Sequence, residues 1–144
     1  MKLNGYIEGY FGKLLSWSER EEILQQIIHQ KLNAYFYCPK EDPYHRLNWK
    51  EPYPELIKKE LGQFSKSCIA NEVKFLFGIS PGIDFKNSYD ELFMKISETR
   101  QLEILDVVIL FDDLFEVQNG EKHAEILNRC NDKFKDINFY CVPS

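Results

Sequence analysis

The sequence predicts an α/β fold built on a parallel sheet, and two observations support this. Five short runs rich in aromatic and β-branched residues alternate with four segments that repeat apolar residues at helical spacing. The 144 residues are 44% hydrophobic, which is enough for one compact domain with its own core. Strands that alternate with helices imply parallel pairing through right-handed crossovers.

The first strand is expected over residues 3–8, and the second over the aromatic-rich residues 32–38. Ser18 with Glu21 has the spacing of a capping box and predicts the start of the helix between these strands. The apolar face of that helix should carry Ile23, Leu24, Ile27 and Ile28.

A long loop should cover residues 39–53. Pro54 fits the first turn of the second helix, because its missing N–H costs nothing there. Residues 73–79 follow as the third strand. The apolar positions of the second helix are Ile57, Leu61, Phe64 and Cys68.

Ser88 with Glu91 gives a second capping-box spacing, which predicts a third helix with Leu92, Phe93 and Ile96 on one face. Residues 107–111 form the fourth predicted strand, whose continuous apolar run is typical of a buried parallel strand. Gly120 opens the fourth helix, and residues 137–142 form the fifth strand. The fourth helix should bury Leu127, Cys130 and Phe134.

Composition excludes several function classes. The net charge is -5 without a Lys/Arg cluster that interleaves with aromatics, which argues against a nucleic-acid partner. There is no secretory signal and no apolar run near the ~20 residues of a membrane helix, so no membrane partner is expected. The cysteines lack C-x-x-C spacing and three lie in apolar stretches, which favours buried thiols and a cytoplasmic location. No cofactor or metal is expected, since the histidines are scattered: His29, His45 and His123.

Two adjacent carboxylates, Asp112 and Asp113, end the fourth strand. Like charges this close resist joint ionisation, so the pair can keep a proton donor beside an anion. In α/β folds the carboxyl ends of strands are also where active sites collect. The alternative interpretation is an ordinary acidic loop that begins a helix.

Five motifs in register resemble glycoside hydrolase family 84, the family of O-GlcNAcases and bacterial β-N-acetylglucosaminidases. They are GYIEGYFG at 5–12, LNAYFYCPKED at 32–42, YHR at 44–46, ISPGID at 79–84 and LFDDL at 110–114. The resemblance implies a TIM-barrel-like (β/α) repeat, truncated to about five parallel strands and four helices. Residues 1–144 would then form a single partial catalytic domain.

The resemblance also implies an activity. Family members remove N-acetylglucosamine with retention, and the nucleophile is the substrate's own 2-acetamido oxygen. Asp112 would accept a hydrogen bond from the acetamido N–H, and Asp113 would protonate the leaving oxygen and then act as base. Gly9 would offer its carbonyl to a sugar hydroxyl, and Lys40 would donate to another. Asp84 could support the site.

Purely structural roles remain open for Gly9, for Lys40 and for the aromatic residues of the second strand. Gly9 could belong to a simple tight turn, and Lys40 could be a solvated loop lysine. Tyr35, Phe36 and Tyr37 could stack on a sugar, although alternation along a strand sends at least Phe36 or its neighbours into the core.

His45 and Arg46 are expected to be structural and to pair with Glu41 or Asp42.

The sequence departs from the family pattern at several points. Lys13-Leu14-Leu15 stands where the family has Arg-Pro-Trp, and Glu41 replaces an aspartate. The family continues after the fifth strand with a Thr-Glu-Tyr segment and later loops that supply further substrate contacts. Five strands of an eight-stranded barrel would leave open edges and an apolar inner face. The sheet could instead stay open in a flavodoxin-like arrangement.

Three functions are therefore weighed. The first is hydrolysis of an N-acetylglucosamine-containing glycoconjugate, with low activity for the isolated chain. The second is a non-catalytic remnant or split half that binds a sugar, a second copy or a complementary chain through its open edges. The third is Mg²⁺-dependent phosphoryl transfer at Asp112 and Asp113. The third ranks last, because no glycine-rich phosphate loop is present.

Overall fold

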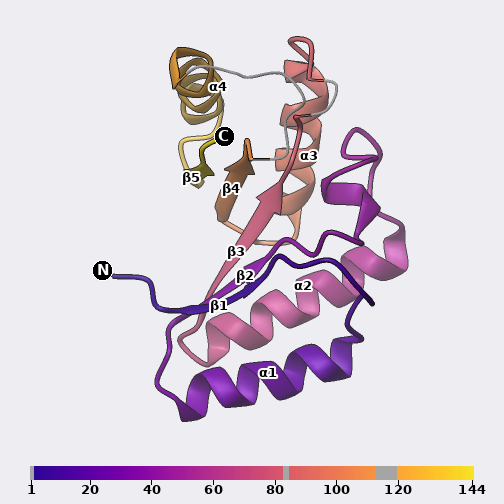
Figure 1. The fold of residues 1–144 in the computed structure, drawn as a ribbon, viewed down its shortest axis with the longest axis vertical. Helices are drawn as coiled ribbons and strands as arrows, with labels where there is room; N and C mark the ends of the chain where they lie inside the picture. Colours follow the sequence, from indigo (N-terminus) through magenta and orange to yellow (C-terminus); the bar gives the residue numbers. More distant parts are fainter. Residues whose placement is uncertain (1, 83–84, 113–119) are drawn as a thin grey trace.

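A computed structural model describes residues 2–82, 85–112 and 120–144 (Figure 1). In this part of the chain strands and helices alternate, as the sequence predicts. The strands are β1 (Gly5–Glu8), β2 (Ala34–Tyr37), β3 (Lys74–Ile79), β4 (Asp106–Leu110) and β5 (Asn138–Val142). The helices are α1 (Trp17–His29), α2 (Glu55–Ala70), α3 (Tyr89–Gln101) and α4 (Gly120–Lys133), with a short 3₁₀ helix, η1 (Pro43–His45), between β2 and α2.

The five strands form one parallel sheet in the order β1-β2-β3-β4-β5. Each strand therefore lies beside the strand that precedes it in the chain, as in a (β/α) barrel. A flavodoxin-like sheet has the order 2-1-3-4-5, so that alternative is wrong. Within the described residues β1 and β5 each pair on one side only, and they form the edges of the sheet.

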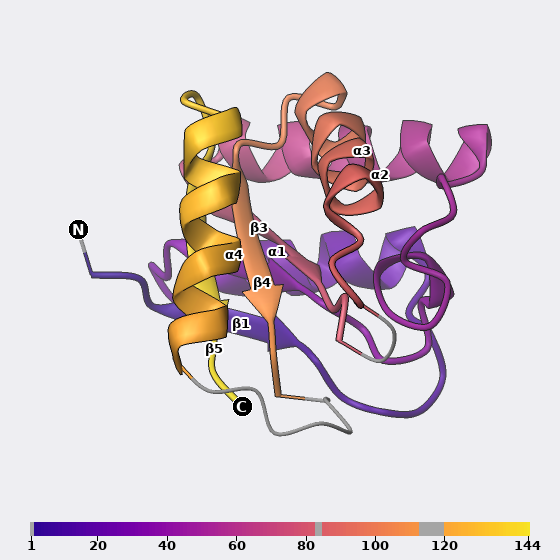
Figure 2. The ribbon, with the colours of Figure 1, turned by 90° about the horizontal axis from the view of Figure 1, so that it is seen from above.

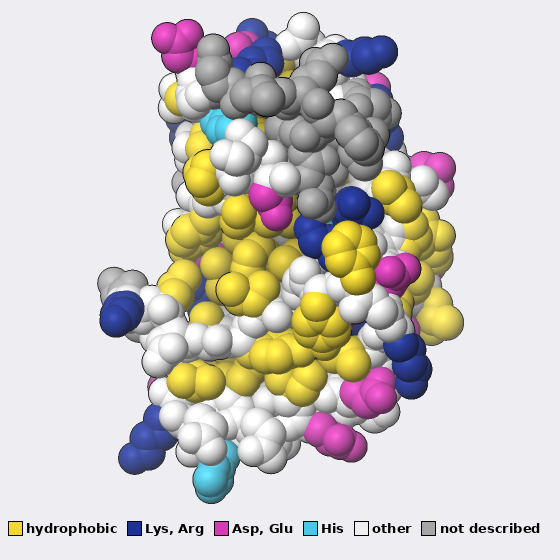
Figure 3. Space-filling view, viewed as in Figure 1, with side chains coloured by type: hydrophobic (Ala, Val, Ile, Leu, Met, Phe, Trp, Pro, Cys, Tyr) yellow, Lys and Arg dark blue, Asp and Glu magenta, His cyan; other side chains and the backbone are white. Residues whose placement is uncertain are grey.

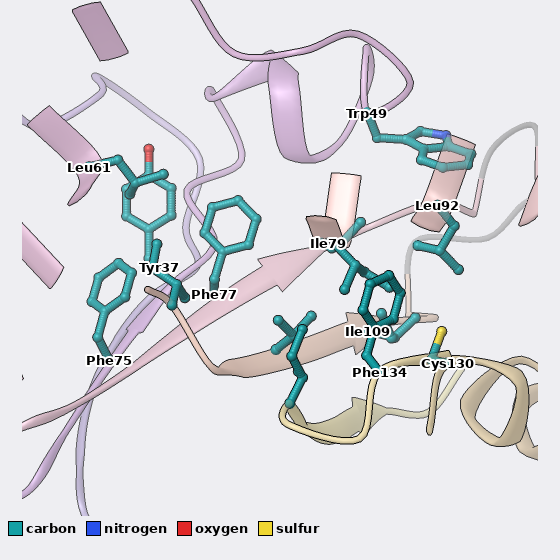
Figure 4. Close-up of a cluster of buried hydrophobic side chains, with 14 of the residues drawn as sticks. Tyr37, Trp49, Leu61, Phe75, Phe77, Ile79, Leu92, Ile109, Cys130 and Phe134 are labelled. Atoms are coloured by element: carbon teal, nitrogen blue, oxygen red, sulfur yellow. The ribbon is translucent and has the colours of Figure 1, made fainter. Parts of the chain in front are cut away.

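The two faces of the sheet have different surroundings. One face packs against α1 to α4, and in Figure 4 side chains of β2, β3 and β4 meet Leu61 of α2, Leu92 of α3 and Cys130 of α4. This is the main core, as the alternation along parallel strands requires. All helices of the described chain thus cover the same face, which is the arrangement of a barrel wall.

The opposite, inner face carries a smaller apolar cluster without any helical residue among those described. Its buried members are Ala34, Cys38, Leu76, Val108 and Leu110. Ile7 of the edge strand β1 is 61% exposed and extends this apolar surface. Figure 3 shows hydrophobic side chains gathered across the middle of the molecule, over the strands of Figure 1. An apolar inner face is what five strands of a barrel predict.

Helix α1 begins two residues earlier than predicted. Ser16, and not Ser18, is its N-cap: the Ser16 hydroxyl accepts from the Glu19 amide at 3.2 Å, and the Glu19 carboxylate accepts from the Ser16 amide at 2.7 Å. Trp17, the first helical residue, stacks on the Tyr37 ring at 6.2 Å between centroids. Ser16 with Glu19 and Ser18 with Glu21 both have capping-box spacing, so spacing alone does not decide between the two serines.

The other helix starts also differ in detail. Ser88 precedes α3 as predicted, but its side chain makes no capping hydrogen bond, so the capping box with Glu91 is wrong. Asp90 and Glu91 lie in the first turn, where negative charge complements the helix dipole. Pro54 is the N-cap residue of α2 and precedes the first helical turn.

The cysteines are free thiols, and three of the four are buried. Burial raises the pKa of Cys68 and of Cys130 to about 12, so both stay protonated at neutral pH. Cys141 of the edge strand β5 is exposed.

No helix in the described ranges combines the length and apolar character that a membrane crossing requires.

Candidate functional site at the carboxyl edge of the sheet

The predicted site residues that the structure describes follow different strands but share one edge. Gly9 comes directly after β1, Lys40 shortly after β2 and Asp112 shortly after β4. All strands are parallel, so these positions lie at the carboxyl edge of the sheet. In Figure 2 the arrowhead of β4 and the C-terminus after β5 point to the same side of the molecule.

Lys40 and Asp112 form an ion pair that reaches over β3. The Lys40 Nζ lies 3.8 Å from the Asp112 Oδ2, and the two side chains are 13% and 39% exposed. Lys40 is therefore mostly enclosed, so the interpretation as a solvated loop lysine is wrong. Asp112 keeps access to solvent, and screening makes the pair a modest source of stability. The geometry gathers a cation and a carboxylate from separate strand ends.

Asp113 and Asp84 lie outside the described residues. The assignment of Asp113 as acid and base stays a prediction, as does the supporting role of Asp84.

Gly9 is held close to the second strand. A Cβ at this position would stand 3.1 Å from the Cys38 Sγ and 3.2 Å from the Ile7 Cγ2. Gly9 does not have the left-handed backbone that would require glycine, whereas Gly12 has a φ of 123°. The close approach of the Cys38 and Ile7 side chains, and not a left-handed backbone, therefore favours a glycine at position 9.

A buried ion pair holds the end of β1, directly before Gly9. Glu8, the last residue of β1, accepts from the Arg20 Nε at 3.0 Å and from the Arg20 Nη2 at 2.9 Å. The Tyr35 hydroxyl donates to the same carboxylate at 2.7 Å. Glu8 and Arg20 are 0% and 1% exposed, so the three side chains fix β1, α1 and β2 together. Sequence spacing does not reveal this network, because its members are far apart in the chain.

The turn that carries Lys40 rests on a second buried network. The Asp42 carboxylate accepts from the hydroxyls of Tyr37 and Tyr53, each at 2.7 Å, and from the Tyr44 amide at 2.9 Å. The sequence does not predict the contact of Tyr53 with Asp42 either, since nothing in the local spacing links the two residues.

The His45 ring makes its hydrogen bond to the turn and not to a predicted carboxylate: its Nε2 lies 2.7 Å from the carbonyl oxygen of Pro39. Burial lowers the pKa of His45, and the nearby Asp42 carboxylate opposes that shift, so Asp42 interacts with the ring by charge alone.

Tyr35 and Tyr37 of β2 do not offer a sugar platform. Tyr35 and Tyr37 are buried in the main core, at 0% and 2% exposure. Phe36 points to the inner face, where it packs against the smaller cluster. The alternation expected for a strand therefore decides their roles.

Metal ligands do not cluster in the described part of the site. Across residues 2–82, 85–112 and 120–144, no group of three or more His, Cys, Asp or Glu side chains is arranged to hold a metal ion. The arrangement that is described suits polar contacts to a neutral ligand. A lysine can donate hydrogen bonds, and a carboxylate and a backbone carbonyl can accept them.

Comparisons with known proteins agree with the resemblance. The family model of beta-N-acetylglucosaminidase matches residues 4–143. Protein O-GlcNAcase from Rattus norvegicus and from Mus musculus is 31% identical over 116 residues, which cover 78% of this chain and 13% of each relative.

Two solved structures match nearly the whole chain. The structure of CpGH84B superposes with a TM-score of 0.90 at 32% identity, covering 99% of this chain and 27% of that protein. A mutant of the O-GlcNAc hydrolase of Thermobaculum terrenum superposes with a TM-score of 0.84 at 25% identity, covering 99% and 35%. The chain thus spans a minor part of its relatives' length, and it belongs to the β-N-acetylglucosaminidase family, glycoside hydrolase family 84.

Proposed function

We propose that the chain carries part of the substrate site of an O-GlcNAcase-like β-N-acetylglucosaminidase, which removes N-acetylglucosamine from a glycoconjugate with retention. Family membership supports the reaction class. The observation that carries the proposal is the approach of Lys40 to Asp112, which joins two strand ends into one polar site.

The proposed reaction needs no enzyme nucleophile. The Asp112 carboxylate accepts a hydrogen bond from the substrate's acetamido N–H and turns the acetamido oxygen toward the anomeric carbon. That oxygen forms the new bond as the glycosidic bond breaks, and Asp113 gives its proton to the leaving oxygen. The ring that this attack closes is a protonated oxazoline, whose N–H stays hydrogen-bonded to Asp112. Asp113 then takes a proton from water as that water bonds to the anomeric carbon and the carbon–oxygen bond of the oxazoline breaks, which restores the acetamido group.

Lys40 and Gly9 would bind the sugar ring. The Lys40 ammonium has donors for a ring hydroxyl, and the Gly9 carbonyl can accept from another. The Lys40 backbone amide donates to the Tyr10 carbonyl at 3.3 Å, so a hydrogen bond joins the loops after β1 and β2. A sugar that contacts both loops would therefore meet a preorganised surface.

Turnover by the chain alone is expected to be low. The chain spans 13% to 35% of the length of these relatives, and the resemblance implies further substrate contacts in the parts of the family domain that follow the fifth strand. Each missing transition-state donor can cost about 10²-fold or more in rate.

The test is hydrolysis of a chromogenic N-acetylglucosaminide by the purified chain, with Asp112→Asn, Asp113→Asn and Asp90→Asn in parallel. Asp90 is an exposed carboxylate of α3 and serves as the matched control. Activity lost in the first two variants and kept in the third would support the proposal. Activity equal in all four proteins, or absent from the unchanged chain, would contradict hydrolysis by this chain.

The sheet edges favour a second candidate, in which the chain binds a second copy or a complementary chain. β1 and β5 each leave one side unpaired within the described residues, and Ile7 of β1 exposes an apolar side chain. Unpaired strand edges are ready templates for pairing. Sedimentation velocity over a range of concentrations would show a rising mass if copies associate, and a constant monomer mass would contradict self-association.

A further inference from the structure

We propose that His45 is a positioning residue for Lys40, because its buried imidazole fixes the turn from which Lys40 reaches Asp112. Its effect on sugar binding rests on the proposed function. The placement of Lys40 can be tested without any sugar, so the two proposals can fail separately.

His45 holds the turn that carries Lys40 through a hydrogen bond. The His45 side chain is fully buried, and its Nε2 donates to the Pro39 carbonyl at 2.7 Å. The Asp42 amide donates to the same oxygen at 3.0 Å and closes a four-residue turn with Lys40 in its second position. Two donors on one carbonyl fix the peptide that directly precedes Lys40.

His45 also contacts the end of the neighbouring strand, β3. The His45 carbonyl accepts from the Ser80 amide at 2.7 Å, and Ser80 directly follows β3. Lys40 must reach over the end of β3 to approach Asp112 after β4. His45 therefore connects the exit of β2, where Lys40 starts, to the exit of β3, which the Lys40 side chain passes.

The 3₁₀ helix that carries His45 is itself held in place by hydrogen bonds. Asp42 caps η1 through the Tyr44 amide and is held by the Tyr37 and Tyr53 hydroxyls. The Tyr53 amide in turn donates to the Glu98 carboxylate of α3 at 3.1 Å. A positioning group is effective only when its own place is fixed, and this network fixes it.

The protonation state fits the role. Burial lowers the pKa of His45, so the ring is neutral at pH 7 with its proton on Nε2, where the acceptor lies. Nδ1 has no hydrogen-bond partner among the described residues. Only one ring nitrogen is used, so a glutamine, which can donate from a similar distance, should replace it, and a leucine should not.

The experiment is competitive acetylation of lysines by trace acetic anhydride, read by mass spectrometry. Lys40 is compared with the exposed Lys59 in the unchanged chain, in His45→Leu and in His45→Gln. A several-fold rise of Lys40 labelling relative to Lys59 is expected in His45→Leu, and near-normal labelling in His45→Gln.

Val107→Ala is the control for general destabilisation, because Val107 is buried near the opposite end of β4. The proposal is overturned if Val107→Ala raises Lys40 labelling as much as His45→Leu does, or if His45→Gln behaves like His45→Leu. If His45→Leu does not fold, an NMR measurement on the unchanged chain tests the bond between His45 and Pro39 instead. A slowly exchanging His45 Nε2 proton in its NMR spectrum supports the bond to Pro39, and fast exchange overturns it.

Sugar turnover gives an independent readout. In a chain that hydrolyses the chromogenic substrate, His45→Leu should lose activity by the same factor as Lys40→Ala, and the double variant should lose no more. If the activity loss of the double variant equals the product of the two single losses, His45 and Lys40 act independently, which would contradict positioning. A chain without turnover would contradict the proposed function, and the labelling result would still decide the role of His45.

Discussion

At the scale of single residues, the buried pair of Glu8 and Arg20 makes the sharpest stability prediction. Replacing Arg20 with Leu leaves the Glu8 charge without its partner in the core. We expect a loss of about 3–5 kcal/mol of unfolding free energy, measured by urea denaturation. The control is Arg100→Leu, whose exposed pair with Asp136 should contribute about 0–1 kcal/mol. Equal losses in the two variants would contradict a structural role for the buried pair.

His45 predicts how stability depends on pH. Burial lowers its pKa in the folded chain, and the nearby charges of Lys40 and Arg46 act in the same direction, against the opposing carboxylate of Asp42. Just below the ordinary histidine pKa of 6.5 the unfolded chain therefore binds more protons than the folded chain. Stability should fall as the pH falls from about 7 to about 5, by up to about 1.4 kcal/mol per pH unit.

Urea unfolding at several pH values, with His45→Gln as the control, measures this dependence. The variant should lose less stability over the same window, because glutamine does not titrate. An identical pH dependence in both proteins would show that His45 does not carry the effect.

At the scale of elements, the start of α1 separates two serines that the sequence presents as equivalent. Ser16→Ala removes the hydroxyl that accepts from the Glu19 amide and should destabilise the chain by about 1 kcal/mol. Ser18→Ala leaves the cap in place and should change stability by less than about 0.5 kcal/mol. Thermal unfolding compares the two variants, and a larger effect at Ser18 would contradict the observed helix start.

Periodicity predicted the type of each element but not the details of its ends. The strands and helices fall where the apolar patterns place them, because burial on one side of a parallel sheet imposes those patterns. The start of α1 was missed because two serines have capping-box spacing, Ser16 to Glu19 and Ser18 to Glu21, and only the first pair forms the cap. In the fold Trp17, which follows this cap, stacks on Tyr37 of β2.

The candidate site was predictable to the extent that strand ends define it. Gly9, Lys40 and Asp112 follow strands that the sequence reveals, so their shared edge follows from parallel pairing. The supports of the site were not predictable. The bond from His45 to Pro39 and the link from Tyr53 to Glu98 join segments brought together only by folding.

At the scale of the whole molecule, strand order and the distribution of the helices define a segment of barrel wall. The helices of the described chain cover one face, and the inner face carries its own apolar cluster. The carboxyl edge of this wall holds the polar site residues. The amino edge instead has a hollow between β3 and β4, lined by residues that include Val73, Ile104 and Asp106.

The central claim is that the carboxyl edge binds N-acetylglucosamine through its acetamido group. The most direct test is an NMR titration of the ¹⁵N-labelled chain with N-acetylglucosamine, and with glucose as a control that lacks the acetamido group. We predict saturable shifts of the Gly9, Lys40 and Asp112 amides with N-acetylglucosamine and much smaller shifts with glucose. The claim would be contradicted by an absence of saturable shifts, by equal shifts with both sugars, or by shifts confined to the amino edge.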